Sequence, residues 1–187
     1  EAIRAYQRVS SNYPNQRVAA LASLRLGRAY ALKGDSTQAL IVYQQISSLY
    51  QTGDFAGLGD YLAGANLFLS SRYEEALDHF KHIVDYYECS QLIDASFAML
   101  LRTYNRLANY EMSIAIGNPL LPKIPFKKEG NWYARSLFYL ADAYYYKSIY
   151  EKSKPFYQKI VNQYSEPTTI ASALTGLILC RKMLLST

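Results

Sequence analysis

The chain has 187 residues, half of them apolar, 19 tyrosines and a formal net charge of +5. This composition is enough for a buried core or a short repeat array, and it excludes a disordered chain. Cys89 and Cys180 are too far apart for a disulfide framework or a clustered zinc site. No apolar run reaches the roughly 20 residues that cross a bilayer, so we expect no direct membrane insertion. Because Glu1 opens the chain without a signal-like segment, we expect a mature protein or an excised fragment of a longer one.

Small residues open a helical pattern at a regular interval. They are Ala2, Ala39, Ala76 and Ser113, each 37 residues apart, and Ser153 after a step of 40. Four residues after them stand Tyr6, Tyr43, Phe80, Gly117 and Tyr157. Further apolar or aromatic residues follow seven and eleven residues after each small residue. This spacing marks one face of an amphipathic helix. We expect Tyr6, Tyr43, Phe80 and Tyr157 to be buried between helices.

A second helical pattern precedes each of these helices, so every period holds two helices. In chain order we predict a half repeat at 1–14, repeats at 16–51, 53–88, 91–125 and 131–165, and a terminal helix at 167–185. Two helices per period, repeated along a chain, are typical of a solenoid. The prediction is an all-α solenoid of antiparallel helix pairs with about nine helices.

The motif from Leu26 to Tyr43 carries a family resemblance. It reads Leu-Gly-x2-Tyr, then Gly-Asp, then Ala-x3-Tyr, and it resembles the tetratricopeptide repeat. The resemblance implies a right-handed superhelix in which Gly27, Gly64 and Ala141 allow close helix crossings. Leu101 departs from this rule and predicts a more open hairpin. The 37-residue period and Tyr13-Pro14 resemble bacterial cell-envelope members, the barrel-assembly lipoproteins and Tol-associated proteins, which implies a periplasmic or outer-membrane-associated location.

The repeat pattern breaks in the second helix of the repeat at 91–125. Gly117, Asn118 and Pro119 predict that the helix ends near Ile116, because an interior proline costs about 3 kcal/mol. The remainder to Gly130 is expected to be a loop that is dispensable for folding. It is either a binding loop or a spacer, with Lys123, Lys127 and Lys128 as its candidate contacts. Pro155 predicts a kink, or a helix that begins late near Lys154.

No constellation of residues indicates catalysis. His79 and His82 lie three apart on one predicted helix, and the apolar register turns them toward solvent or a neighbouring unit. Asp142 has no acid or base partner in the pattern. The sequence contains no glycine-rich phosphate loop, nucleophile elbow or His-Glu-x-x-His motif. We therefore predict no catalytic residue, no metal, no cofactor and no enzymatic activity.

The resemblance places a binding surface on the concave face, lined by the first helix of each hairpin. The candidate groove residues are Arg28, Tyr61, Phe68, Arg102, Asn105, Arg106, Phe138, Asp142, Tyr145 and Tyr146. Tyrosine and arginine often dominate recognition energy. Leu24 and Arg28 stand where a chaperone-binding clamp of the family would need Lys and Asn, which disfavours a co-chaperone role.

Two functions fit these features. The first is a protein-protein interaction scaffold that binds a peptide or protein segment in its groove, within a bacterial envelope complex. The alternative is a non-catalytic positioning or sensory domain of a larger enzyme or signalling protein. Nucleic acid is not expected as a partner, because the basic residues form no stripe at the repeat interval. The sequence leaves the oligomeric state open.

Overall fold

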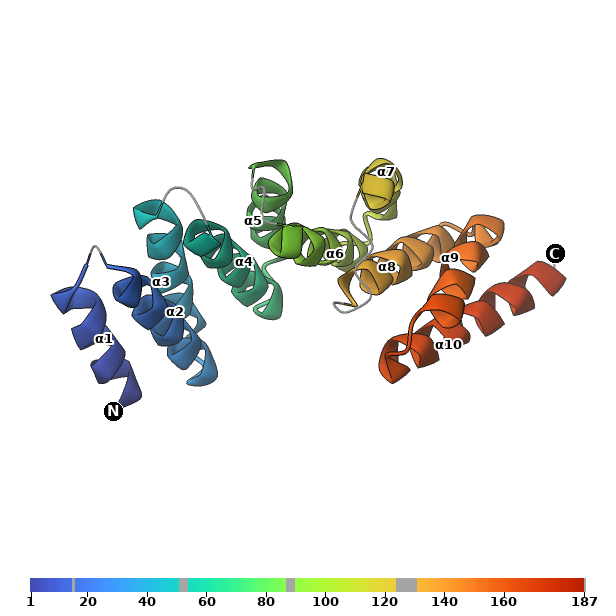
Figure 1. The fold of residues 1–187 in the computed structure, drawn as a ribbon. Helices are drawn as coiled ribbons and strands as arrows, with labels where there is room; N and C mark the ends of the chain where they lie inside the picture. Colours follow the sequence, from blue (N-terminus) through green and yellow to red (C-terminus); the bar gives the residue numbers. More distant parts are fainter. Residues whose placement is uncertain (15, 51–53, 87–89, 124–130, 187) are drawn as a thin grey trace. The chain divides into compact units, whose positions relative to one another are not determined.

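The computed structural model describes residues 1–14, 16–50, 54–86, 90–123 and 131–186, with the side chains of 54, 90 and 91 left aside. Within these ranges the chain forms helices and no strands (Figure 1). They are α1 (Ala2–Asn12), α2 (Arg17–Leu32), α3 (Ser36–Leu49), α4 (Asp54–Leu69), α5 (Tyr73–Tyr86), α6 (Ser90–Arg106), α7 (Tyr110–Leu120), the 3-10 helix η1 (Leu121–Lys123), α8 (Trp132–Tyr146), α9 (Tyr150–Gln163) and α10 (Pro167–Leu185). The described residues thus hold ten α-helices where about nine were expected. The chain divides into two compact units, Glu1–Ser96 and Phe97–Thr187, and the division falls within the residues of α6.

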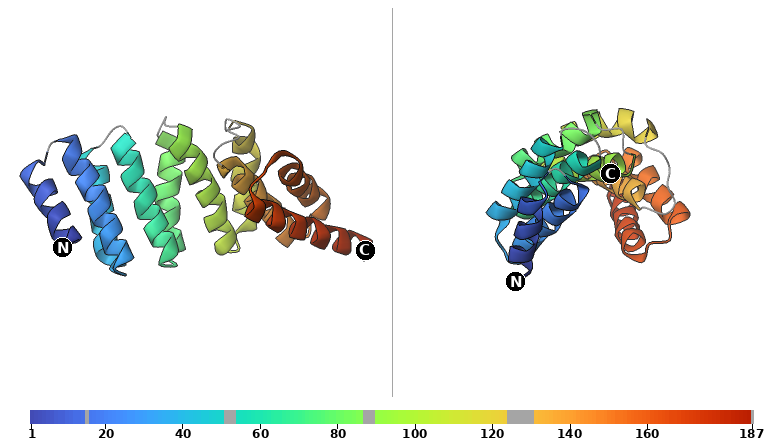
Figure 2. Two further views of the ribbon diagram at one scale, coloured as in Figure 1. Left: turned by 60° about the horizontal axis from the view of Figure 1, so that its bottom comes forward. Right: turned by 60° about the vertical axis from the view of Figure 1, so that its left-hand side comes forward.

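In the first unit each helix packs against the next one along the chain. Helices α1 to α5 lie side by side in chain order (Figure 2). Within two hairpins, a glycine on the first helix faces an aromatic ring on the second. A Cβ added at Gly27 would lie 2.8 Å from Cδ1 of Tyr43, and one at Gly64 would lie 2.9 Å from Cε1 of Phe80. The rings therefore occupy the space that a side chain at Gly27 or Gly64 would take, as predicted.

The expected burial of the aromatic residues is confirmed at three positions. Tyr43, Phe80 and Tyr157 are buried. Tyr6 is only half-buried, so its predicted burial is wrong. The reason is that, among the described helices, α1 packs on α2 alone and has no buried residue.

The turn between the helices of each hairpin repeats as closely as the helices do. Gly34, Ser71, Ala108 and Ser148 have φ of 84°, 59°, 53° and 60° at equivalent positions. Asp35 and Asn109 then cap the second helices by accepting hydrogen bonds from the backbone nitrogens of Gln38 and Met112. Only the first of these turns uses glycine, the residue that adopts positive φ without steric cost.

In the second unit, the hairpin of α6 and α7 reverses the usual pairing of small and large residues. Leu101, fully buried, stands where other hairpins have a small residue, and Gly117 stands where they have an aromatic one. A Cβ at Gly117 would lie 3.5 Å from Cδ2 of Leu101 and 2.8 Å from Cδ1 of Leu140. The large side chain has moved to the first helix, and the more open packing of this hairpin stays a prediction.

Helix α7 also runs further than expected. It continues through Gly117, Asn118 and Pro119 to Leu120. Because Pro119 lies in the last turn, only one backbone hydrogen bond is lost there. The Asn118 side chain exchanges hydrogen bonds of 2.7 and 3.0 Å with the hydroxyl of Tyr144 on α8. Since Leu121 in η1 is buried as well, the first part of the predicted dispensable loop belongs to the core.

Helix α9 begins at Tyr150 although Pro155 lies inside it, so the predicted late start near Lys154 is wrong. Pro155 removes only the bond to the Glu151 carbonyl, near the start of the helix. Burial of Tyr157 between α8 and α10 offsets that loss. A Cβ at Gly176 of α10 would lie 2.7 Å from Cε1 of Tyr157, so α10 also approaches this ring closely.

Candidate functional site

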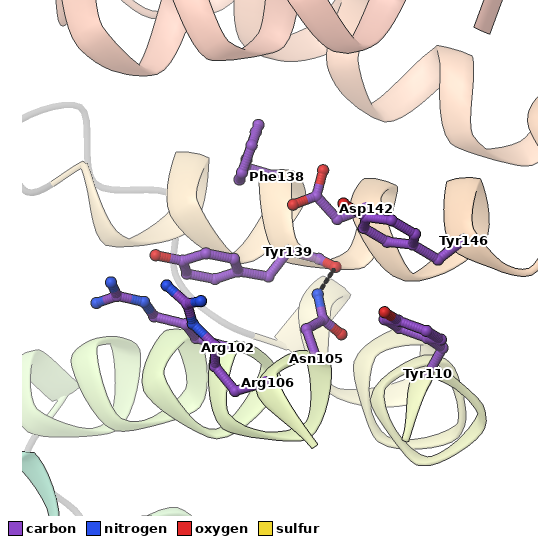
Figure 3. A pocket seen from close by; sticks show the side chains of 8 residues that line it. All are labelled: Arg102, Asn105, Arg106, Tyr110, Phe138, Tyr139, Asp142 and Tyr146. Atoms are coloured by element: carbon purple, nitrogen blue, oxygen red, sulfur yellow. Dashed lines mark hydrogen bonds between the residues drawn. The ribbon is translucent and has the colours of Figure 1, made fainter. Parts of the chain in front are cut away.

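A cavity of about 500 Å³ opens between the first helices of the second unit (Figure 3). Helix α6 lines one side with Arg102, Asn105 and Arg106, at a spacing that places all three on one face. Helix α8 lines the other with Phe138, Tyr139, Asp142 and Tyr146, and Tyr110 from the start of α7 completes the lining.

Six of the ten groove residues expected from the sequence meet in this cavity. They are Arg102, Asn105, Arg106, Phe138, Asp142 and Tyr146. Tyr110 and Tyr139 were missed. Tyr110 opens a second helix, and the hairpin turn brings its ring to 5.0 Å from that of Tyr146 in a stacked arrangement. Tyr139 follows Phe138, and the aromatic run around it was the signal that could have included it.

Asn105 holds the two sides of the cavity together. Its Nδ2 donates a hydrogen bond of 2.7 Å to the backbone carbonyl of Tyr139 (Figure 3). Its Oδ1 is buried and accepts no hydrogen bond from the described residues. A polar bond between helices fixes their spacing at this point, so the cavity is preformed in the second unit.

One end of the cavity is cationic. Cζ of Arg102 lies 6.0 Å from the centre of the Tyr139 ring. Burial raises the pKa of Tyr139, while the positive charges of Arg102, Arg135 and Arg106 act to lower that pKa. The positive charges of three guanidinium groups therefore act on the Tyr139 side chain, and they favour anionic ligands at this end.

The other end carries the carboxyl group of Asp142. Burial raises the pKa of Asp142 to about 6, although the hydrogen bond donated by the Tyr157 hydroxyl lowers that pKa. Burial also raises the pKa of Tyr157, and the charge of Asp142 raises it further. Tyr157 thus remains a hydrogen-bond donor that orients the carboxylate.

A smaller cavity of about 160 Å³ shares Phe138 and Tyr139 with the first. Arg135, Thr168, Thr169 and Ser172 complete its lining, the last three from the start of α10. Glu166 caps this helix and accepts hydrogen bonds from the hydroxyls of Thr168 and Thr169, which hold the pKa of its carboxyl at about 2. The two cavities lie along the same face of α8.

Four of the expected groove residues lie elsewhere. Phe68 is 6% exposed and packs 5.2 Å from the ring of Tyr73, so it is a core residue and its assignment to the groove is wrong. The start of α5 covers it. Tyr61 is half-buried, 6.0 Å from Phe80, and Arg28 is exposed on α2. Tyr145 packs against Tyr150 at 5.4 Å and does not line the cavity.

The two histidines of α5 match their expected placement only in part, because His82 is exposed to solvent as expected while His79 is half-buried. The Nδ1 atoms of His79 and His82 lie 3.2 and 2.8 Å from the carboxylate oxygens of Asp60, which also accepts a hydrogen bond from Ser47. They face α4 of their own hairpin, because Asp60 is 5% exposed and needs partners there. Across the described ranges, no group of three or more His, Cys, Asp and Glu side chains could hold a metal ion.

Of the candidate lysines near Gly130, Lys123 ends η1 and is exposed. Lys127 and Lys128 lie outside the described residues.

Helix α10 is long and apolar enough to cross a membrane by length and composition, with a mean hydropathy of 1.4. Arg181 and Lys182 lie within this helix, and the expectation of no direct membrane insertion stays a prediction. One side of the helix packs on α9 and α8 through buried residues that include Ala173, Gly176 and Cys180. Its apolar character thus partly serves the core of the second unit.

Two segments of the chain, residues 21–52 and 135–166, match the family model of the tetratricopeptide repeat. These two segments are similar to tetratricopeptide repeats. They cover most of the hairpins α2–α3 and α8–α9, so the α8 side of the cavity lies in a segment that matches the family model. Proteins built of tetratricopeptide repeats are generally scaffolds for protein-protein interaction and are typically non-catalytic. No curated protein sequence matches the chain.

Solved structures share the fold. The crystal structure of MamA has a TM-score of 0.67 at 17% identity, covering 86% of this chain and 85% of that one. The apo form of RapI has a TM-score of 0.71 at 18% identity, covering 97% and 56%. The tetratricopeptide repeat domain of P58(IPK) has a TM-score of 0.57 at 14% identity, covering 100% and 52%. The chain thus spans about half the length of the last two.

Proposed function

We propose that the chain is a non-catalytic scaffold that binds a peptide or protein segment in the 500 Å³ cavity of its second unit. The observation that carries this proposal is the lining itself. Two arginines, three tyrosines and one phenylalanine converge on a cavity of the size that ligand sites have. Tyrosine and arginine are the side chains that most often dominate binding energy.

The lining combines fixed and accessible groups. Asn105 fixes the distance between α6 and α8 through its bond to Tyr139, while Arg106 and Tyr146 remain exposed. A preformed site loses less conformational entropy on binding, which increases affinity for an extended segment. The repeats on which the cavity is built support a protein partner.

A selection experiment tests this function. Random peptides displayed on phage are selected on the full chain, and their affinities are measured again with variants. Arg106→Glu and Tyr146→Ala should each weaken binding about tenfold or more. Arg28→Glu and Tyr86→Ala are matched controls at exposed positions outside the cavity and should leave affinity unchanged. Peptides that bind all four variants equally would place the site elsewhere.

The 37-residue period and Tyr13-Pro14 support a bacterial envelope setting for this scaffold, which we include in the proposal. Fractionation of the native host tests it. Recovery with the periplasm or outer membrane is expected, and recovery with the cytoplasm would contradict it.

A further inference from the structure

The two ends of the cavity carry opposite charges. Arg102 and Arg106 extend along one end, beside the ring of Tyr139 (Figure 3). Asp142 lies toward the other end, between Phe138 and Tyr146. A single ligand that fills the cavity meets both charges at once.

The cationic end continues into the smaller cavity. Arg135 and the start of α10 extend the same face beyond Tyr139, with Thr168 and Ser172 in the lining. Guanidinium groups bind carboxylates with paired hydrogen bonds. This end thus suits an acidic residue and has room along α8 for a neighbouring residue of the same segment.

The anionic end suits a cation for two reasons. The Asp142 carboxylate forms no ion pair within the described part of the chain, and its hydrogen bond comes from the neutral hydroxyl of Tyr157. Aromatic rings also stand around it, and the faces of Phe138, Tyr146 and Tyr110 attract an ammonium or guanidinium group. A Lys or Arg side chain can satisfy both the carboxylate and the rings.

We propose that this cavity recognises a peptide segment of mixed charge, in which an acidic residue contacts Arg102 and Arg106 and a Lys or Arg residue contacts Asp142. The inference rests on the proposed function and names the class of segment. An entirely acidic segment would bring a like charge to Asp142, and an apolar one would desolvate both charges without pairing them. The arrangement thus selects against segments of a single sign.

Designed peptides on the full chain test this inference. Fluorescently labelled peptides on a Gly-Tyr-Ser background carry Glu, Lys or Gln at two positions, in both orders, with one to four residues between them. Binding is followed by fluorescence anisotropy. At one spacing, the peptide with one Glu and one Lys should bind about tenfold more tightly than the peptide with two Gln residues. It should also bind more tightly than the peptide with two Glu residues or the peptide with two Lys residues.

Two variants then assign each charge. Asp142→Asn keeps an acceptor for the Tyr157 hydroxyl, so the fold is retained, and it should abolish the preference for Lys over Gln while the preference for Glu remains. Arg106→Glu should abolish the preference for Glu, and Arg28→Glu is the control that changes neither. Tight binding without an opposite-charge preference overturns this inference and leaves the proposed function intact. If neither these peptides nor the phage-selected ones bind, the proposed function fails, and the inference fails with it.

Discussion

Single residues set the spacing of the helices at their crossing points. The ring of Tyr43 occupies the place of a side chain at Gly27, and Phe80 does the same at Gly64. Because the ring is anchored in the core, a methyl group there cannot be accommodated without shifting a helix. Glycine at these positions is therefore a packing requirement.

Gly27→Ala should lower the free energy of unfolding by about 1–3 kcal/mol through overpacking. The double variant with Tyr43→Leu provides the control, because a smaller side chain makes room for the methyl group. The effect of Gly27→Ala should shrink in that background. Equal effects in both backgrounds, measured by denaturant unfolding, would show that the ring is not what excludes a side chain.

Asp142 should cost stability when it is ionised. Its pKa is about 6 in the folded chain, against 3.8 for the ordinary group, so the folded state holds the proton more tightly. The protonated carboxyl therefore stabilises the folded state fully below about pH 4, and this stabilisation is lost as the pH rises to about 6. Tyr157 on α9, Tyr110 on α7, Tyr139 on α8 and Cys180 on α10 face this carboxyl.

Asp142→Asn should therefore stabilise the chain at pH 7.5, by at most about 3 kcal/mol for two pKa units. The gain should disappear near pH 4, where the wild-type carboxyl is neutral. Taking the difference in free energy of unfolding between the variant and the wild-type chain at each pH removes the effect of all groups that titrate in both proteins. A gain that is the same at both pH values would contradict the burial of the charge. A residue kept at such a cost is consistent with a role in binding.

At the scale of elements, the periodicity of the sequence was enough to predict helices in hairpins, because spacings of four and seven mark a buried face. It was not enough for α7. Gly117 and Pro119 predict a helix break when only their neighbours in sequence are considered. The residues that compensate, Leu101, Leu140 and Tyr144, lie 16 or more positions away and meet α7 only after folding.

The candidate site shows the same limit. Helical spacing placed six residues around the cavity, because they share a face of α6 or α8. Tyr110 could not be predicted this way, since it belongs to another helix and reaches the cavity through a hairpin turn. Phe68 satisfied the spacing and still lies in the core, because the end of its helix is covered by the next one.

The hairpin turns offer a stabilising change. Ala108 has a φ of 53°, in the left-handed region that favours glycine. Ala108→Gly should raise the free energy of unfolding by about 0.5–1 kcal/mol, the relief of steric strain less the added entropy of the unfolded chain. Ala29→Gly, inside α2, is the control and should destabilise by about 1 kcal/mol. A loss of stability at both sites would show that the turn is not strained.

For the whole molecule, stability depends on contacts between neighbouring helices, and α10 is the last described helix of the second unit. It covers Tyr157, which is 2% exposed, and contributes Gly176 at the closest approach. Deleting residues 167–187 should lower the melting temperature and expose tyrosine to solvent, because repeat arrays lose stability when a terminal face is uncovered. An unchanged melting temperature and tyrosine fluorescence would assign α10 a role outside the core.

The central claim is that the second unit holds the binding surface. The most direct test is a titration of the isotopically labelled full chain with a phage-selected peptide, followed by backbone amide NMR shifts. Shifts should gather on α6, the start of α7 and α8, around Arg106, Tyr110, Asp142 and Tyr146. Shifts confined to α1–α5, or to the exposed side of α10, would contradict the assignment of this cavity as the site.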